Sequence, residues 1–491
     1  MKKTQQAAAP EIVFGSAEPK VSVAISRQVK AGRLARIAPK LYTSNFKDPP
    51  ENIVQRNFYV ILSHFFPGAV LSHRSALEGG VAHDHTIFLT YKYTKKVSLP
   101  GITIRLLKGK GAVAGDMPFM GALHIASRAR ALLENLQPAR VRTGVSKNWS
   151  QQQVEDYLDE IARVHGNREL NQLRDQAKQL AKSLKLTAEF KTLDVLIGAL
   201  LGTRDEKTLT SKTALARAKG VPYDTHRLEL FTALYAELRR HVLPRRPEPT
   251  LTAKGLRHLA FFEAYFSNYI EGTEFVVEEA ADIVFRNKLV PNRPADAHDI
   301  QGTYRIVANS QEMNRIPGTA DECIELLKSR HAILLAGRPE KQPGEFKSQI
   351  NRAGETLFVS PDLVTGTLIK GFELYRALED PLVRALFMMF LVAEVHPFAD
   401  GNGRIARIMM NAELVHGKCA RIIIPTVYRE DYLLALRALT RQGNTQPYIR
   451  MLDRAQEFTA RIDFNRYDAA LDALRQANAF LEPHEGKLAM P

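Results

Sequence analysis

The chain of 491 residues has little cysteine and no long apolar run. Its two cysteines, Cys323 and Cys419, are far apart and form no CxxC pair, which is evidence against a disulfide framework or a cysteine zinc site. No apolar segment reaches the roughly 18 residues that a membrane span needs. The start, MKKTQQAAAPEIVF, lacks the continuous apolar segment of a signal peptide. We therefore expect a cytoplasmic protein of bacterial type with no membrane partner.

Acidic residues are scarce in the first third of the chain. Residues 1–150 carry 22 lysines and arginines against 8 acidic residues, residues 151–250 carry 17 against 14, and residues 251–491 carry 29 against 31. Nearly all of the net charge of +15 therefore lies in one section. Such an asymmetry indicates a separate module with a polyanionic partner, most often nucleic acid. The alternative is a basic surface that serves solubility alone.

The length of the chain and its hydrophobic content of 45% predict a globular protein of several domains. LPRRPEPTLTAKG (243–255) has three prolines in six residues and is the clearest linker, and a polar stretch at 141–150 is a weaker one. Between them, apolar residues recur at three- and four-residue steps, which predicts helices. We expect a multidomain, mainly α-helical fold with a helical connector at 150–243, a main region at 255–455 and a helical tail at 456–491.

The region 10–125 combines helix and strand patterns with dense positive charge. VSVAISRQVKAG (21–32) predicts a short helix closed by a glycine, and RLARIAPKLYTS (33–44) predicts two short strands. A helix followed by a two-stranded ribbon is what a winged helix-turn-helix presents to duplex DNA. The basic residues expected to contact DNA are Arg27, Lys30, Arg33, Arg36 and Lys40. Through ISRQVKAGRLARIAPKLYTS and GAVLSHRSAL, this α+β region resembles the winged-helix antitoxins of the AbiEi type, which implies binding to promoter DNA.

The stretch HPFADGNGRIAR (396–407) lies between two apolar segments. PLVRALFMMFLVAEV (381–395), before it, is apolar on nearly every side and predicts a buried helix, and IARIMMNAEL predicts another. The twelve residues therefore form a loop held between two buried helices, and they contain a histidine, an aspartate, two glycines around an asparagine, and two arginines.

The residues of this loop favour a ligand with several phosphates. Gly401, Asn402 and Gly403 fall where the second helix begins, and there free N–H groups and the helix dipole form an anion site. Arg404 and Arg407 are three residues apart, so that both can reach phosphate oxygens from the first turn.

His396 and Asp400 add reactive groups to the predicted anion site. A histidine at the edge of the loop can accept a proton near neutral pH. An aspartate beside phosphates is suited to Mg²⁺, which takes one or two carboxylates together with phosphate oxygens. The combination favours phosphoryl or nucleotidyl transfer over a structural loop, because positioning and charge neutralisation do most of the work in such reactions.

HPFADGNGRIAR resembles the signature of Fic-domain enzymes, HxFx(D/E)GNGRxxR, at every specified position. The resemblance covers about residues 255–455 and implies a helical core whose β-hairpin flap, PGEFKSQINRAGETLFVSPDLV, clamps a target segment by strand addition. Family members typically cleave the α–β phosphate bond of a nucleotide and move AMP onto a protein hydroxyl. By position, His396 would deprotonate that hydroxyl, Asp400 would hold Mg²⁺ and the GNG residues would line the phosphate cradle. Arg404 would steady the α- and β-phosphates, and Arg407 would grip the γ-phosphate.

A second stretch, SNYIEG, resembles the inhibitory motif (S/T)xxxE(G/N) of the same family through Ser267, Glu271 and Gly272. The resemblance implies that Glu271 reaches Arg407 and occupies the arginine that the γ-phosphate needs. A carboxylate–guanidinium pair of this kind must break before the arginine can take a phosphate. The alternative is that Glu271 merely ends an amphipathic helix.

Together, these patterns favour an auto-inhibited protein AMP-transferase with a DNA-binding N-terminal module. One alternative keeps the fold but uses another nucleotide or removes AMP. Another is a transcriptional regulator whose Fic core serves as a nucleotide sensor. The expected ligands and partners are ATP as substrate, Mg²⁺, a target protein with a Ser, Thr or Tyr hydroxyl, duplex DNA, and a second copy of the chain in a homodimer.

Overall fold

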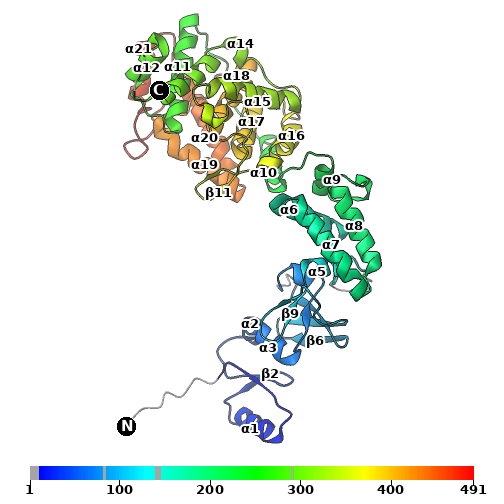
Figure 1. The fold of residues 1–491 in the computed structure, drawn as a ribbon. Coiled ribbons are helices and arrows are strands. Elements are labelled where there is room, and N and C mark those ends of the chain that lie inside the picture. Colours follow the sequence, from blue (N-terminus) through cyan, green and yellow to red (C-terminus); the bar gives the residue numbers. More distant parts are fainter. Residues whose placement is uncertain (1–9, 81–83, 139–144, 289, 291) are drawn as a thin grey trace. The chain divides into compact units, whose positions relative to one another are not determined.

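The computed structural model describes residues 10–80, 84–138, 145–288, 290 and 292–491 (Figure 1). The chain forms two compact units, Met1–Lys219 and Gly220–Pro491. The fold is mainly helical, as the sequence predicts. None of the helices in the described ranges combines the length and the apolar character that crossing a bilayer requires.

The first part of the N-terminal unit has one helix and a three-stranded antiparallel sheet. Its elements are β1 (Ile12–Phe14), α1 (Pro19–Lys30), β2 (Ala35–Ala38) and β3 (Leu41–Thr43), with β3 in the centre of the sheet. Helix α1 closes at Gly32, whose φ is 68°, because the Arg33 N–H donates to the Gln28 carbonyl. The predicted helix and its two following strands are confirmed, and their binding to DNA stays a prediction.

A six-stranded mixed sheet follows in the same unit. Its strands have the order β6-β7-β5-β4-β9-β8, and the pairs β5–β7 and β4–β9 are parallel. This part contains α2 (Pro50–Arg56), α3 (Phe58–Phe65), β4 (Val70–Leu71), α4 (Arg74–Leu77), β5 (Thr86–Tyr91), β6 (Lys95–Leu99), β7 (Ile102–Lys108), β8 (Met117–Pro118) and β9 (His124–Ile125). Strand β5 is buried along most of its length, in keeping with its central place.

Helices complete the N-terminal unit. They are α5 (Arg128–Asn135), α6 (Gln151–His165), α7 (Asn167–Leu184), α8 (Thr187–Leu200), the short 3₁₀ helix Glu206–Thr208 and α9 (Lys212–Ala218). A capping box between Ser150 and Gln153 starts α6. The helical character predicted for 150–243 is confirmed, but the two units divide between Lys219 and Gly220, so that the last helix of this stretch belongs to the second unit.

The second unit is a helical bundle with one short hairpin. Its helices are α10 (Thr225–Leu238), α11 (Ala253–Ile270), α12 (Val277–Arg286), α13 (Pro294–Val307), α14 (Ser310–Met313), α15 (Ala320–Leu334), α16 (Val364–Tyr375), α17 (Pro381–Val395), α18 (Asn402–His416), α19 (Arg429–Gln442), α20 (Gln446–Ala460) and α21 (Tyr467–Gln476). Short 3₁₀ helices lie at Pro339–Lys341, Pro361–Leu363 and Thr426–Tyr428, and the predicted flap forms strands β10 (Arg352–Ala353) and β11 (Thr356–Leu357).

Helix α17 is the centre of this bundle. Its sequence starts a helix well, because the Asp380 carboxylate accepts from the N–H groups of Leu382 and Val383 and Pro381 takes the first position. All but a few of its side chains are buried, and α18 packs along it. Helix α10 joins the same core through Phe231, whose ring lies against two phenylalanines of α17. The loop between α17 and α18 is therefore held by two buried helices, as predicted.

The place of α10 in the second unit can be tested by stability. Phe231→Ala removes a fully buried ring and should lower the free energy of unfolding of the second unit by about 3–5 kcal/mol. Val242→Ala, at a side chain that is 99% exposed, should change it by less than about 0.5 kcal/mol. Chemical denaturation of the full chain, with proteolysis as the probe of unfolding in each unit, measures the change in both variants. An equal response of the two variants would contradict the assignment of α10.

Candidate functional site

The loop from His396 to Gly401 is braced from within by Asn402. The Asn402 Oδ1 accepts from the Phe398 N–H at 2.8 Å, and its Nδ2 donates to the Phe398 carbonyl at 2.8 Å. Gly401, with φ of 74°, turns the chain into α18 in a conformation that favours glycine. The Asn402 side chain thus shapes the loop, and the role of the GNG backbone in phosphate binding stays a prediction.

His396 ends helix α17 and lies under the flap. The Ala393 carbonyl lies 3.1 Å from Nδ1, and because a carbonyl can only accept, the proton sits on Nδ1 and Nε2 keeps its lone pair. Its ring stacks on the ring of Phe358 at 3.7 Å. Burial lowers the pKa of His396 to about 4, so that the imidazole is neutral at pH 7. A neutral histidine with an available Nε2 has the protonation state that a general base needs.

Asp400 carries a negative charge at the start of α18. Burial opposes its ionisation, but the Gly401 N–H, the Arg404 charge and the Lys341 charge outweigh this effect and lower the pKa of Asp400. The Lys341 ammonium lies 3.5 Å from one carboxylate oxygen. Within the described ranges, no cluster of three or more histidine, cysteine, aspartate or glutamate side chains could hold a metal. A lone ionised aspartate beside a phosphate site suits Mg²⁺, which would take its other ligands from the nucleotide and water.

Arg407 is enclosed by the residues of the SNYIEG stretch. Its Nη2 lies 2.8 Å from the Glu271 Oε1 and 2.8 Å from the Ser267 carbonyl, and its Nε donates to the Ser267 hydroxyl at 3.0 Å. Its other nitrogen lies 3.4 Å from the Tyr432 hydroxyl. Although burial opposes it, the Arg407 charge holds the pKa of Glu271 below its usual value. The ion pair that the sequence predicts is therefore present.

Two glycines make this ion pair possible. Gly272, with φ of 89°, closes helix α11 directly after Glu271, because the Thr273 N–H donates to the Asn268 carbonyl. At Gly403, any Cβ atom would collide with the Glu271 Oε1. The carboxylate thus lies against the first turn of α18, in the place predicted for a phosphate.

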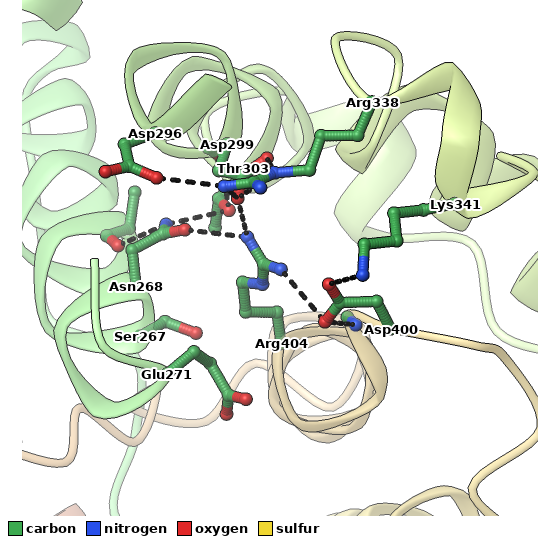
Figure 2. Close-up of polar contacts among 12 residues, drawn as sticks. Ser267, Asn268, Glu271, Asp296, Asp299, Thr303, Arg338, Lys341, Asp400 and Arg404 are labelled. Atoms are coloured by element: carbon green, nitrogen blue, oxygen red, sulfur yellow. Dashed lines mark hydrogen bonds and ion pairs between the residues drawn. The ribbon is translucent and has the colours of Figure 1, made fainter. Parts of the chain in front are cut away.

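Arg404 has other partners, as Figure 2 shows. Its Nη1 lies 2.7 Å from Asp299 Oδ2 and 3.2 Å from Asn268 Oδ1, and its Nη2 lies 3.8 Å from Asp400. Asp299 also pairs with Arg338, and the Asn268 amide donates to a threonine of α13. The predicted phosphate contact of Arg404 thus comes from a side chain fixed by neighbouring helices.

His396, Glu271, Gly403 and Tyr432 meet at one cavity of about 590 Å³. The flap forms another wall through residues 353–358. The volume lies in the range of pockets that take a small-molecule ligand such as a nucleotide. A proton acceptor, a helix N-terminus and the carboxylate that pairs with Arg407 therefore share one chamber.

The loop of this site lies near the C-terminal end of a segment that matches a known family. Residues 322–414 match the model of the Fic/DOC family. The chain contains a Fic/DOC domain. The signature loop and its two arginines lie within the matched residues of this Fic domain, whereas Glu271 precedes them.

The Fic domain has named relatives. Protein adenylyltransferase Fic of Drosophila melanogaster is 27% identical over 211 residues, which cover 40% of this chain and 42% of that protein. Protein adenylyltransferase fic-1 of Caenorhabditis briggsae is 22% identical over 219 residues, or 42% of each chain. A solved structure of Caenorhabditis elegans Fic-1 covers 65% of this chain and 88% of its own, with 19% identity and a TM-score of 0.36. The match thus spans about two fifths of these curated relatives.

Several residues of the site have no sequence signal of their own. They are Asn268, Asp299, Arg338, Lys341 and His331. His331 stacks on the Phe398 ring at 3.8 Å, and its Nε2 lies 3.1 Å from the Asp400 carbonyl, so that it holds the loop from below. Of this group, only Asn268 lies inside a motif that the sequence had singled out, SNYIEG.

The residues predicted to contact DNA lie in the other unit. Arg27 and Lys30 are exposed on α1, and Arg33, Arg36 and Lys40 are exposed on and beside the ribbon. None of the five forms an ion pair with a carboxylate in the described part of the chain. Their charge is therefore available to a phosphate backbone.

The Glu271–Arg407 pair should make stability depend on pH. Because the folded pKa of Glu271 is lowered, its contribution is present above the unfolded pKa of about 4.3 and is lost as pH falls through the folded value. Glu271→Gln should lose about 1–2 kcal/mol at pH 7, a modest figure because the Glu271 side chain stays 30% exposed.

Denaturant titrations from pH 3 to pH 8 measure the difference between the two proteins. It should be constant above about pH 5.5 and shrink below pH 4.5. Glu274→Gln, at an exposed glutamate nearby, should show no such trend. A Glu271→Gln difference that does not depend on pH would show that the pair carries no net charge interaction.

Proposed function

We propose that the Fic domain moves AMP from ATP to a Ser, Thr or Tyr hydroxyl of a target protein. The observation that carries this proposal is a neutral His396 with its Nε2 available, in the same chamber as the start of α18. The relatives named protein adenylyltransferase support the same activity. Because they match only part of this chain, the nucleotide and the target are part of the proposal.

Each group of the site has one task in this reaction. The His396 Nε2 takes the proton of the target hydroxyl, whose oxygen then attacks the α-phosphorus. The bond between the α- and β-phosphates breaks, and pyrophosphate leaves. Arg404 holds the α- and β-phosphates, and Arg407 holds the γ-phosphate at the far end of the cradle. Asp400 would hold Mg²⁺, which neutralises phosphate charge when bound.

We further propose that Glu271 keeps this reaction off. Its carboxylate lies 2.8 Å from Arg407, and only a glycine at 403 leaves room for it. A γ-phosphate and the carboxylate would compete for the same guanidinium. ATP that enters beside Glu271 has its α-phosphate out of line, and a misplacement of about 1 Å can cost about 10²-fold in rate.

Glu271→Gly should therefore raise the incorporation of labelled AMP, into the protein itself or into extract proteins, by about 10²-fold. Arg407→Ala should abolish the gain, because the γ-phosphate then has no cation at its end of the cradle and there is no inhibition left to relieve. The double variant Glu271→Gly/Arg407→Ala should be as inactive as Arg407→Ala alone. Incorporation by the wild type, both single variants and the double variant measures this.

His396→Ala in the Glu271→Gly background is the matched inactive control, with an expected loss of about 10²–10⁴-fold. ATP binding by this control should stay within a few-fold of its parent. A wild type as fast as Glu271→Gly would refute auto-inhibition. An active double variant would show that Arg407 is not the residue that Glu271 blocks.

For the N-terminal unit, we propose that α1 and the β2–β3 ribbon bind duplex DNA. The support is the net positive charge of this section and the five exposed basic residues on adjoining elements. Each phosphate contact releases counterions, so that affinity should fall steeply with salt.

The double charge reversal Arg27→Glu/Lys30→Glu should weaken binding of the full chain to a duplex from its upstream promoter by at least about tenfold. The matched control, Lys178→Glu/Lys182→Glu, reverses two exposed charges on α7 of the same unit and should bind like the wild type. Gel shifts at 50 and 200 mM salt measure both. Equal losses in the two variants would reduce the interaction to net charge, and absence of binding by the wild type at low salt would refute it.

A further inference from the structure

Arg227 lies outside the matched Fic segment but contacts two residues within it, Glu394 and Leu357. It sits in the first turn of α10, before the proline-rich linker, and is 8% exposed. Buried arginines are rare and need charged or polar partners. Besides the neighbouring His226, whose Nδ1 lies 3.0 Å from Nη1, the partners of Arg227 lie on two other elements of the second unit, 130 or more residues along the chain.

One partner is Glu394 in the last turn of α17. The Arg227 Nε lies 2.7 Å from the Glu394 Oε1, and the Glu394 side chain is 3% exposed. The alignment of these atoms is poor for a hydrogen bond, so the contact is mainly Coulombic. The other Glu394 oxygen accepts from the Thr440 hydroxyl at 2.6 Å. Glu394 is thus fixed from both sides, two residues before His396.

The second partner is the flap. The Arg227 Nη2 donates to the carbonyl of Leu357, the last residue of β11. The next residue is Phe358, whose ring stacks on His396 at 3.7 Å and 7°. One guanidinium therefore holds both supports of the His396 ring: the helix that carries it and the strand that covers it.

The start of α10 is itself anchored, which gives Arg227 a fixed origin. The Asp224 N–H donates to the Thr367 hydroxyl of α16 at 2.9 Å. Gly366 packs so closely on the Pro222 carbonyl that a Cβ atom would clash with backbone. Because these two contacts with α16 fix the segment, the guanidinium transmits the position of α10 to the flap.

We propose that Arg227 is a positioning residue that aligns the flap and the His396 imidazole with each other. The role of His396 as base rests on the proposed function, whereas the alignment itself does not. Lysine would not replace Arg227, because a single ammonium on a flexible stem cannot hold a carboxylate and a carbonyl on two elements at once.

The electrostatic surroundings of His396 make the alignment measurable. The charged groups that act on His396 are Lys347, Glu271 and Asp400. Burial is the main reason that the pKa of His396 is about 4, and Phe358 provides part of that cover. If the flap loosens, water reaches the ring and the pKa should rise toward 6.5.

The experiment uses the full chain without nucleotide. Hydrogen exchange of the amides in residues 352–358 reports the flap, and NMR titration of the His396 ring reports its cover. Arg227→Met should speed flap exchange by about tenfold or more and raise the His396 pKa by at least one unit. Glu394→Gln keeps the Leu357 contact and should leave flap exchange within about twofold of the wild type. Arg227→Lys should behave like Arg227→Met in the flap.

Two further variants keep the test decisive. Arg227→Met/Glu394→Gln leaves no unpaired buried charge, so it should fold even where Arg227→Met does not, and it should still show the fast flap. Arg239→Met, at an exposed arginine after the same helix, is the matched control and should match the wild type. The proposal would be overturned if Arg227→Met and Arg227→Met/Glu394→Gln showed the same flap exchange and the same His396 titration as Arg239→Met.

Failure of the proposed function would appear separately. In that case Glu271→Gly would incorporate no AMP, while the exchange and titration results would stand. If transfer occurs, Arg227→Met in the Glu271→Gly background should lower it by about tenfold at pH 7 and shift the acid limb of the pH profile upward, with ATP affinity unchanged within twofold. An acid limb that stays in place would count against the alignment.

Discussion

Two guanidinium groups buried at the start of α18 are the constraint on which the second unit depends. Arg404 is 3% exposed and Arg407 is 5% exposed. Removing such ions from water costs several kcal/mol each unless carboxylates and hydrogen bonds compensate. The compensation comes from Glu271 and Asp299, and it brings helices α11 and α13 against α18. The folded chain therefore covers both cations with its own carboxylates.

The two ion pairs are not equivalent. Asp299 is 1% exposed, and its carboxylate is shared with Arg338, so that displacing it would remove the nearest carboxylate of Arg404 and one of the two carboxylates of Arg338. Glu271 stands at a helix end before a glycine, and its side chain keeps 30% exposure. Glu271 is thus the more exposed of the two carboxylates, which is why the proposed competition with a phosphate falls on Arg407 and not on Arg404.

Local signals in the sequence predicted the signature loop well, whereas residues that act through long-range contacts were not predicted. A loop between two apolar helices follows from composition and spacing. Asp299 and Arg227 carry no such signal, because each is one charged residue on an ordinary helix. The proline-rich linker after Leu243 suggested a break there, whereas α10 belongs with the later helices. The apolar face of α10, with Phe231, packs on α17 and so assigns this helix to the second unit. The composition of a linker carries no information about such packing.

The same packing fixes the position of the His396 ring. His396 has φ of 52°, a left-handed conformation that costs about 1 kcal/mol for a side chain of this kind. The Lys347 N–H donates to the Pro397 carbonyl, and the Asn351 amide donates to the Phe398 carbonyl, so that the flap base and the loop hold each other. The Phe358 N–H returns to the Asn351 carbonyl. The edge of the flap therefore has its register fixed by groups that are already bonded to the loop beside His396.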